Sequence, residues 1–332
     1  MEATGLDRLC APWLGGRGAI FVLHRAAPSG ATVLDPDYQT TADLLDDALH
    51  LVKASGADCI ALDELPERLR SRRGRRFAVF TFDDGYRDNV TVALPVFRSH
   101  RAPLCIYAVT GLLDRTVDYW WGALATLVEH HDRIDPGPLG LAGTIDTASW
   151  QDKQATYTRI ERWVHEDLER RSAAVAAWCA SAYAIDGRAL LTTDALSWDD
   201  MRALADDPLV TIGAHSQTHR RLATLDETQL RHELRGGRER LEHELGRPVR
   251  HLAYPYGGPA ACGPREFAAA AEAGYGTAVT TRRGNVFAEH AGHLTALPRR
   301  RLTEGQPDRR TARRALSGTE WFLRRGPRVV LP

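Results

Sequence analysis

Carboxylates and imidazoles stand directly after two short apolar runs of this chain, where their spacing could support metal chemistry. Two histidines and one carboxylate can hold a divalent cation and leave a coordination position open for water. A second carboxylate next to such a group can act as a base. The combination predicts metal-assisted hydrolysis. The residues are Asp83 and Asp84 after the run 77–82, and His215 and His219 after the run 209–213.

The spacing of His215 and His219 gives this prediction a geometric form. Residues four apart lie on the same face of a helical turn, so both imidazoles could reach one zinc ion. Either feature alone is weak evidence. Histidine pairs also occur on surfaces at helix starts, and Asp83-Asp84-Gly85 has the composition of an ordinary turn. The prediction therefore depends on the segments acting together.

Alternating strand-like and helical patterns must position these residues. Such alternation predicts a parallel sheet or barrel with helices outside, and sites in these folds gather at the carboxyl ends of the strands. Between about 119 and 195 the pattern becomes helical, which predicts an insertion. We expect residues 1–300 to form the barrel with this insertion, and the Arg-rich residues 301–332 to pack on it as a tail. The strand-like runs are 18–25, 77–82, 103–109, 209–212, 252–254 and 277–280, and the main helical runs are 40–54, 227–245 and 265–273.

Composition limits the class of protein. The chain has 332 residues, of which 43% are hydrophobic and 26% charged, and its formal net charge is zero. These values are typical of a soluble globular protein and give no indication of nucleic-acid binding. No apolar run approaches the length of a membrane span or of a signal-peptide core. The five cysteines form no C-x-x-C pair, which favours buried thiols in a reducing compartment. We therefore expect a cytoplasmic location.

Three segments together resemble the motifs of the NodB-type polysaccharide deacetylases, carbohydrate esterase family four. They are Thr81–Gly85, His215–His219 and Ala253–Gly257, the last in an Ala-Tyr-Pro-Tyr-Gly variant of the third motif. The resemblance extends from about residue 20 to residue 301. It implies a distorted (β/α) barrel of about seven parallel strands. It also implies removal of N-acetyl groups from amino sugars of a polysaccharide, an oligosaccharide or a lipid-linked glycan precursor.

The resemblance also implies a role for individual residues, carried over motif by motif. The backbone N–H of Tyr256 would help to hold the oxyanion. Zinc is the expected metal, although nickel, cobalt or iron could use the same ligands. The implied ligands are Asp84, His215 and His219, with Asp83 as the base that takes a proton from metal-bound water.

Two positions depart from the classical family pattern. Ala253 stands where the third motif usually carries an arginine that steadies the base. Arg299 is the candidate to replace it, with Arg300 and Arg301 as alternatives. The classical Leu-x-His motif is absent as well. Some relatives use a histidine at the end of the first strand, so His24 is the candidate general acid. Its alternative is a structural histidine bonded to a backbone carbonyl.

The predicted partner is a carbohydrate carrying N-acetyl groups, with peripheral contact to a lipid-linked substrate as a further prediction and the oligomeric state left open. One alternative is hydrolysis of another small amide, such as a formamido sugar. Another is a non-catalytic glycan-binding protein on the same fold, which the presence of every motif carboxylate and histidine disfavours. Trp120 and Trp121 would either wall the sugar site or seat the insertion on the barrel.

Overall fold

Seven parallel strands close into a barrel in the computed structural model, which describes residues 15–71, 74–141, 143–302 and 331. Around the barrel the strands follow the order β1-β12-β11-β10-β9-β6-β5, and β5 pairs again with β1 to close it. The short β4 pairs with β5 on its outer side. The fold class predicted from the sequence is confirmed. The strands are β1 (Gly18–Leu23), β4 (Asp58–Cys59), β5 (Phe77–Phe82), β6 (Leu104–Ala108), β9 (Val210–Ala214), β10 (His251–Ala253), β11 (Thr277–Arg283) and β12 (Leu297–Arg301).

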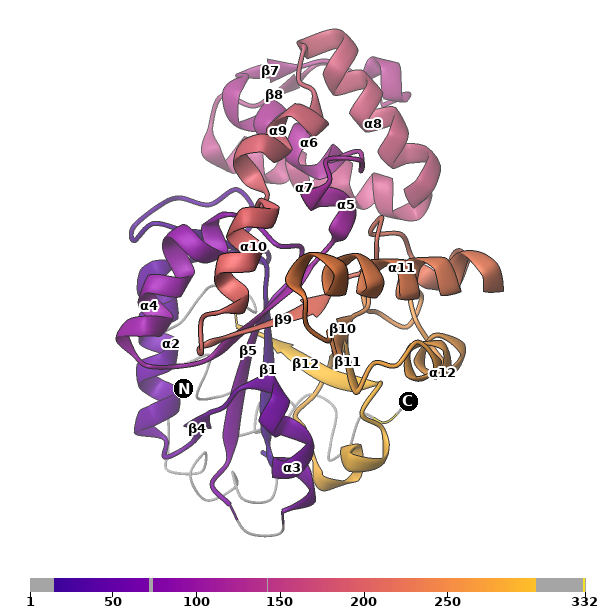
Figure 1. Cartoon of the computed structure of the whole chain (residues 1–332). Helices are drawn as coiled ribbons and strands as arrows, with labels where there is room; N and C mark the ends of the chain where they lie inside the picture. The colour runs from indigo at the N-terminus through magenta and orange to yellow at the C-terminus, as the bar shows by residue number, and fades with distance from the viewer. Residues whose placement is uncertain (1–14, 72–73, 142, 303–330, 332) are drawn as a thin grey trace.

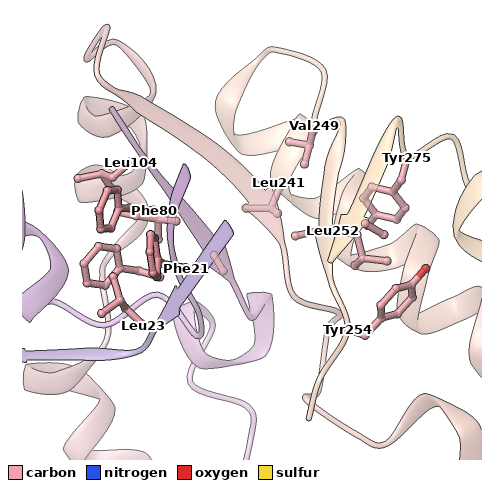
Figure 2. Close-up of a cluster of buried hydrophobic side chains, with 14 of the residues drawn as sticks. Phe21, Leu23, Phe80, Leu104, Leu241, Val249, Leu252, Tyr254 and Tyr275 are labelled. Carbon is pink, nitrogen blue, oxygen red and sulfur yellow. The ribbon is translucent and has the colours of Figure 1, made fainter. Parts of the chain in front are cut away.

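The strands are apolar on both faces because each face packs against a separate core. Side chains alternate between the two faces of a strand. On β5, Val79 belongs to the cluster inside the barrel, whereas Phe80 packs outside it with Phe21 of β1. Figure 2 shows Phe21, Phe80 and neighbouring side chains of this outer cluster. A residue two positions beyond another on a strand therefore shares its face.

Helices cover the outside of the barrel. The longest of them, α11, has the bounds predicted from the sequence. It begins after Asp226, whose side chain accepts a hydrogen bond from the Gln229 N–H, and it ends at Gly246 with φ of 63°. The outer helices are α2 (Ala42–Ala54), α4 (Leu94–Ser99), α10 (Trp198–Ala205), α11 (Glu227–Leu245) and α12 (Pro264–Glu272). The short α3 (Leu65–Arg70) instead contributes Leu65 and Leu69 to the cluster inside the barrel.

A helical insertion lies at one end of the barrel (Figure 1). It has its own buried apolar cluster, which includes Leu124, Ile160, Val175 and Trp178. This core lets the inserted helices keep a fixed shape beside the barrel mouth. The elements are α6 (Trp120–His130), the hairpin of β7 (Arg133–Ile134) and β8 (Ile145–Asp146), α7 (Trp150–Glu166), α8 (Leu168–Tyr183) and α9 (Gly187–Asp194).

The predicted Arg-rich tail falls almost wholly outside the described residues, so its packing on the barrel stays a prediction. The same holds for the division of the chain at residue 300. Three short elements complete the part near the barrel mouth: β2 (Arg25–Ala27), β3 (Gln39–Thr41) and α5 (Thr110–Leu113). Among the described residues, no helix is both long enough and apolar enough to cross a bilayer.

Candidate active site

The polar residues singled out in the sequence gather at one mouth of the barrel. β1, β5 and β9 are parallel and end at Leu23, Phe82 and Ala214. The residues that follow these ends are His24, Asp83 and His215. The interior face of β5 continues from Val79 through Thr81 to Asp83, so Asp83 turns toward the barrel axis. This placement follows from the two-residue period of the strand.

Asp84, His215 and His219 form a cluster suited to a divalent cation. One ligand atom from each residue lies within 4.8 Å of the other two. The Asp84 Oδ1 lies 3.5 Å from Nε2 of His215 and 3.4 Å from Nε2 of His219. This oxygen is buried and makes no hydrogen bond to any residue that the structure describes. A buried carboxylate oxygen without a donor is costly, and a cation facing it would satisfy it.

The protonation of these groups also fits a metal site. Burial lowers the pKa of His215, and it lowers that of His219 to about 4, so both rings are neutral at pH 7. The His215 Nδ1 lies 2.7 Å from the Ala253 carbonyl oxygen, to which it donates, so the ring presents its Nε2 lone pair to the cluster. Burial raises the pKa of Asp84 to about 6, against the opposing effect of His215. A nearby cation would lower this pKa again and so favour the charged form of the carboxylate.

The prediction that the two histidines share a helical turn is wrong. Residues 215–220 form a loop, with left-handed backbone at Ser216 (φ 64°) and His219 (φ 58°). The loop brings both Nε2 atoms to Asp84 without helical periodicity. The two histidines therefore meet at Asp84 because of the loop conformation, and not because residues four apart share a helix face.

Glu233 on α11 holds this loop in place and was missed in the sequence. Its buried carboxylate accepts hydrogen bonds from the N–H groups of Gln217 and Thr218, both at 2.9 Å. A Cβ on Gly237, one turn further along α11, would stand 2.9 Å from the Ser216 backbone. The available signal was an acidic residue on the apolar face of α11, between Leu230 and Leu234, next to a glycine pair within a helix.

Asp83 is clamped by Arg299 inside the barrel. The guanidinium donates to both carboxylate oxygens, at 2.7 Å to Oδ1 and 2.6 Å to Oδ2, in the bidentate arrangement that favours arginine. It also donates to the Thr280 carbonyl oxygen and the Thr81 hydroxyl. Burial works against ionisation of Asp83. The charge and hydrogen bonds of Arg299, together with the neighbouring His215 and His24, outweigh burial and hold the pKa of this carboxylate well below its usual range.

Of the three candidate arginines, Arg299 is the one whose guanidinium is found on Asp83. Its position two residues after Leu297, which faces the barrel interior, explains this. Arg301 instead pairs with Asp37 at 3.0 Å. The two-residue period of the strand places Arg300 on the opposite face and so excludes it as the partner of Asp83. The same period places Arg299 and Arg301 on one face, so it cannot choose between them.

His24 lies beside Asp83, with 3.9 Å between its Nε2 and the Asp83 Oδ2. Its ring meets the edge of Tyr38, and its buried Nδ1 has no hydrogen-bonding partner in the described part of the chain. The alternative of a structural histidine anchored through its ring to a carbonyl is therefore not what the structure shows. Burial lowers the pKa of His24 to about 3, so the ring is neutral at pH 7 before substrate binds.

Tyr256 occupies a tight turn at the same mouth. Its φ is 62°, and Gly257 follows with φ of 58°. No acceptor among the described residues pairs with the Tyr256 backbone N–H. The Tyr256 ring packs against two histidine rings, with its centroid 4.8 Å from that of His219 and 5.5 Å from that of His165 in the insertion. The turn thus leaves a backbone donor unpaired next to the metal-ligand cluster.

A cavity of about 120 Å³ lies between the barrel mouth and the insertion. Its lining includes His24, Asp83, Asp84, His215, His219 and Tyr256. The indole N–H of Trp121 donates to the Tyr86 hydroxyl at 2.7 Å, and the Trp121 ring lies 5.4 Å from that of His219. Trp121 therefore both lines the cavity and seats the insertion, the two readings left open by the sequence. The cavity also has a polar end that sequence reasoning missed, formed by Asp35, Tyr157 and Glu161.

The chain is similar to known deacetylases in sequence and in fold. Residues 142–278 match the polysaccharide deacetylase family model. This match indicates a hydrolase that acts on amide carbon–nitrogen bonds, and it supports the NodB-type family expected from the motifs. The particular third-motif variant stays a prediction. No match is found among the curated proteins.

Solved structures with the same fold include several deacetylases. The Streptococcus pyogenes deacetylase PplD, in complex with acetate, is 17% identical with a TM-score of 0.55, and the match covers 87% of this chain and 93% of that one. The polysaccharide deacetylase BC0361 from Bacillus cereus is 16% identical, with a TM-score of 0.53 and coverage of 90% and 69%. IcaB from Ammonifex degensii is 14% identical, with a TM-score of 0.53 and coverage of 90% and 97%.

Proposed function

We propose that this chain is a metal-dependent N-deacetylase that removes the acetyl group from an N-acetylated amino sugar. The observation that carries the proposal is the convergence of Asp84, His215 and His219 around an unpartnered carboxylate oxygen. The pair of Asp83 and Arg299 stands next to it. A bound divalent cation would polarise the amide carbonyl and lower the pKa of a coordinated water to about 7.

The residues around this cluster divide the proton transfers of amide hydrolysis between them. Asp83 takes a proton from the attacking water as the oxygen bonds to the acetyl carbon. Arg299 fixes the direction of the Asp83 carboxylate, since it holds both oxygens. His24, which is neutral before substrate binds, collects this proton and delivers it to the sugar nitrogen as the carbon–nitrogen bond breaks. The products are acetate and the free amine.

The unpaired N–H of Tyr256 stabilises the negative charge that develops on the carbonyl oxygen. Backbone donors of this kind act without reorganisation, because the turn already fixes them. The left-handed conformations of Tyr256 and Gly257 hold the N–H at the mouth of the barrel. A lipid-linked glycan precursor and a cytoplasmic location remain further proposals, to be tested with substrate panels and cell fractionation.

The proposal is tested by measuring metal content and acetate release together. Purified protein is depleted with a chelator, reloaded with zinc, nickel, cobalt or iron, and assayed on N-acetylated chito-oligosaccharides. We expect activity to disappear on depletion and to return with at least one metal. Replacement of a single ligand should cost both metal and activity, so His219→Ala is compared with His243→Ala, an exposed histidine on α11.

Asp83→Asn separates the base from the metal site. We expect this variant to bind metal with nearly wild-type stoichiometry and to lose at least about 100-fold in kcat, the usual range for removal of a general base. Unchanged turnover by Asp83→Asn would disprove the assignment of Asp83. Full activity in the chelated protein would disprove metal dependence.

A further inference from the structure

The size of the active-site cavity limits what the enzyme can hold. The volume of about 120 Å³ corresponds to roughly 10 water molecules, since one water needs about 10–15 Å³ by this measure. That is the scale of one monosaccharide and is well short of a disaccharide. The cavity therefore fits a single sugar residue that enters it, with the remainder of any larger substrate outside.

The helical insertion forms the wall of this cavity that faces the metal-ligand cluster. Trp120 and Trp121 of α6 and His165 of α7 line it opposite the barrel residues. The insertion is fixed to the barrel side by Arg25, which pairs with Asp88 at 2.8 Å and with Asp194, the last residue of α9, at 3.2 Å. The wall is thus held in position by its own core and by partly buried ion pairs.

The polar end of the cavity has hydrogen-bonding groups that the protein leaves unused. Tyr157 lines the cavity, and its hydroxyl has no hydrogen-bonding partner among the described residues. Within the described part of the chain, the Asp35 carboxylate accepts one hydrogen bond, from the Asp37 N–H at 2.9 Å. The nearest basic group to Glu161 is His165, 3.7 Å away. Asp35 and Glu161 are half-buried and all three residues line the cavity, so their polar groups are accessible to a ligand there.

We infer that the cavity binds one terminal N-acetylated sugar, and that Asp35, Tyr157 and Glu161 recognise its ring hydroxyl groups. This inference rests on the proposed deacetylase function and specifies its substrate. Hydroxyl groups can donate to both carboxylates and pair with the Tyr157 hydroxyl.

Two experiments test the inference. The first compares metal-loaded protein acting on the methyl β-glycoside of N-acetylglucosamine and on chitopentaose, with the position of each deacetylation mapped by mass spectrometry. We expect turnover of the glycoside and reaction at a chain end only of the pentasaccharide. The second measures kcat/KM for the glycoside in Tyr157→Phe and Glu161→Gln. We expect a loss of about 10-fold or more in Glu161→Gln, since a hydrogen bond to a charged group is worth at least that factor. The loss in Tyr157→Phe should be roughly 2–10-fold, because its hydroxyl is neutral, and both losses should arise mainly through KM.

Glu166→Gln is the matched control, because Glu166 lies at the end of the same helix, is exposed, and pairs with Arg171 outside the cavity. Metal content and thermal unfolding of each variant show whether it is folded. Deacetylation at internal residues of the pentasaccharide would overturn the inference while the proposed function stands. Unchanged kcat/KM in both cavity variants would also overturn it.

Absence of acetate release from every probe would overturn the proposed function, and binding then decides the inference separately. Calorimetric titration of the methyl glycoside into the wild-type protein and into Glu161→Gln gives that answer. Binding that weakens about 10-fold in the variant supports the single-sugar cavity, since the same hydrogen bond is lost. Equal binding, or no binding to either protein, overturns it.

Discussion

The carboxylates on the two sides of the cavity differ in whether an arginine side chain is paired with them. On the barrel side, Asp83 is buried and both of its oxygens are bonded to Arg299. The other side is the polar end formed by Asp35, Tyr157 and Glu161, which we call the insertion side. Neither carboxylate there is paired with a lysine or arginine among the described residues. Burial and nearby charge shift the pKa of Asp83 and that of Asp35 in opposite directions, down for the first and up for the second.

The difference separates positioning from recognition. A buried carboxylate that the protein itself compensates is held in one charge state and one orientation, which suits a group that must act on a water molecule. A carboxylate left without a partner costs stability in the free protein, and a ligand that supplies donors offsets that cost. The barrel side therefore provides the chemistry, and the insertion side selects the sugar.

Removal of Arg299 should have the largest effect, because it leaves Asp83 without a lysine or arginine partner, as Asp35 and Glu161 already are in the described part of the chain. Arg299→Met leaves the Asp83 charge buried and unpaired, and we expect the free energy of unfolding to fall by about 3–5 kcal/mol. Activity should fall at least about 100-fold, since the base is no longer oriented. Chemical denaturation and acetate release measure the two effects.

Arg98→Met is the control for this change, because Arg98 forms an exposed pair with Asp207 at 2.7 Å. An exposed pair of this kind contributes about 0–1 kcal/mol. Adding Asp83→Asn to Arg299→Met should restore part of the stability and none of the activity, since it removes the unpaired charge and the base together. Equal losses in Arg299→Met and Arg98→Met would show that the buried clamp has no special role.

Gly237→Ala should have an intermediate effect, which tests whether the metal ligands depend on the packing of their loop. The added Cβ would stand 2.9 Å from the Ser216 backbone, between the two histidine ligands in sequence. We expect a stability loss of about 1–3 kcal/mol. We also expect a fall in metal affinity of about 10–100-fold, as for other changes to groups that support metal ligands. Calorimetric metal titration gives the second value.

Gly236→Ala provides the comparison within the same helix turn. A Cβ at Gly236 meets only the end of the Gln217 side chain, which can move. The gain in helix propensity, about 1 kcal/mol, offsets the loss of the hydrogen bond from Gln217 to the His232 carbonyl oxygen. Metal affinity should therefore be nearly unchanged in this variant. If both alanine variants bound metal alike, the contact between loop and helix would not matter.

The sequence was sufficient to predict the barrel and the residues at its mouth, because both follow from periodicity that is local in the chain. Buried strands such as β5 appear as apolar runs, and the polar residue after each run lies at the carboxyl end. The choice of Arg299 needed the register of β12 against β11, which includes an irregularity between Val279 and Arg283. No local pattern supplies that register.

The insertion side could not be predicted in the same way. Tyr157 and Glu161 are four residues apart on α7, but so are many pairs on that helix. Their meeting with Asp35, more than a hundred residues earlier, depends on how the insertion docks on the barrel. Docking is decided by contacts such as those of Arg25 and Trp121, which leave no periodic signal. Sequence reasoning therefore located the chemistry but missed the recognition end.

Asp35→Asn should give the smallest effect, and one of opposite sign to that of Arg299→Met. Burial, together with the charge of Glu161 and of Asp37, raises the pKa of Asp35 to about 6, although the Asp37 N–H and Arg301 oppose the rise. In the unfolded chain the group titrates near pH 4. The folded protein therefore loses stability as the pH rises from about 4 to about 6, and the loss stays constant above that range.

The asparagine variant carries no such penalty and can still accept the Asp37 N–H. We expect its free energy of unfolding at pH 8 to exceed that of the wild type by roughly 1–2 kcal/mol, with the difference vanishing near pH 4. Asp118→Asn, at an exposed pair with Arg188, should show no comparable pH dependence. Activity should fall in Asp35→Asn even as stability rises. Such a trade-off between stability and activity is expected of a group whose role is to bind a ligand. A variant destabilised equally at both pH values would mean that Arg301 already compensates Asp35, and the contrast between the two sides of the cavity would then be lost.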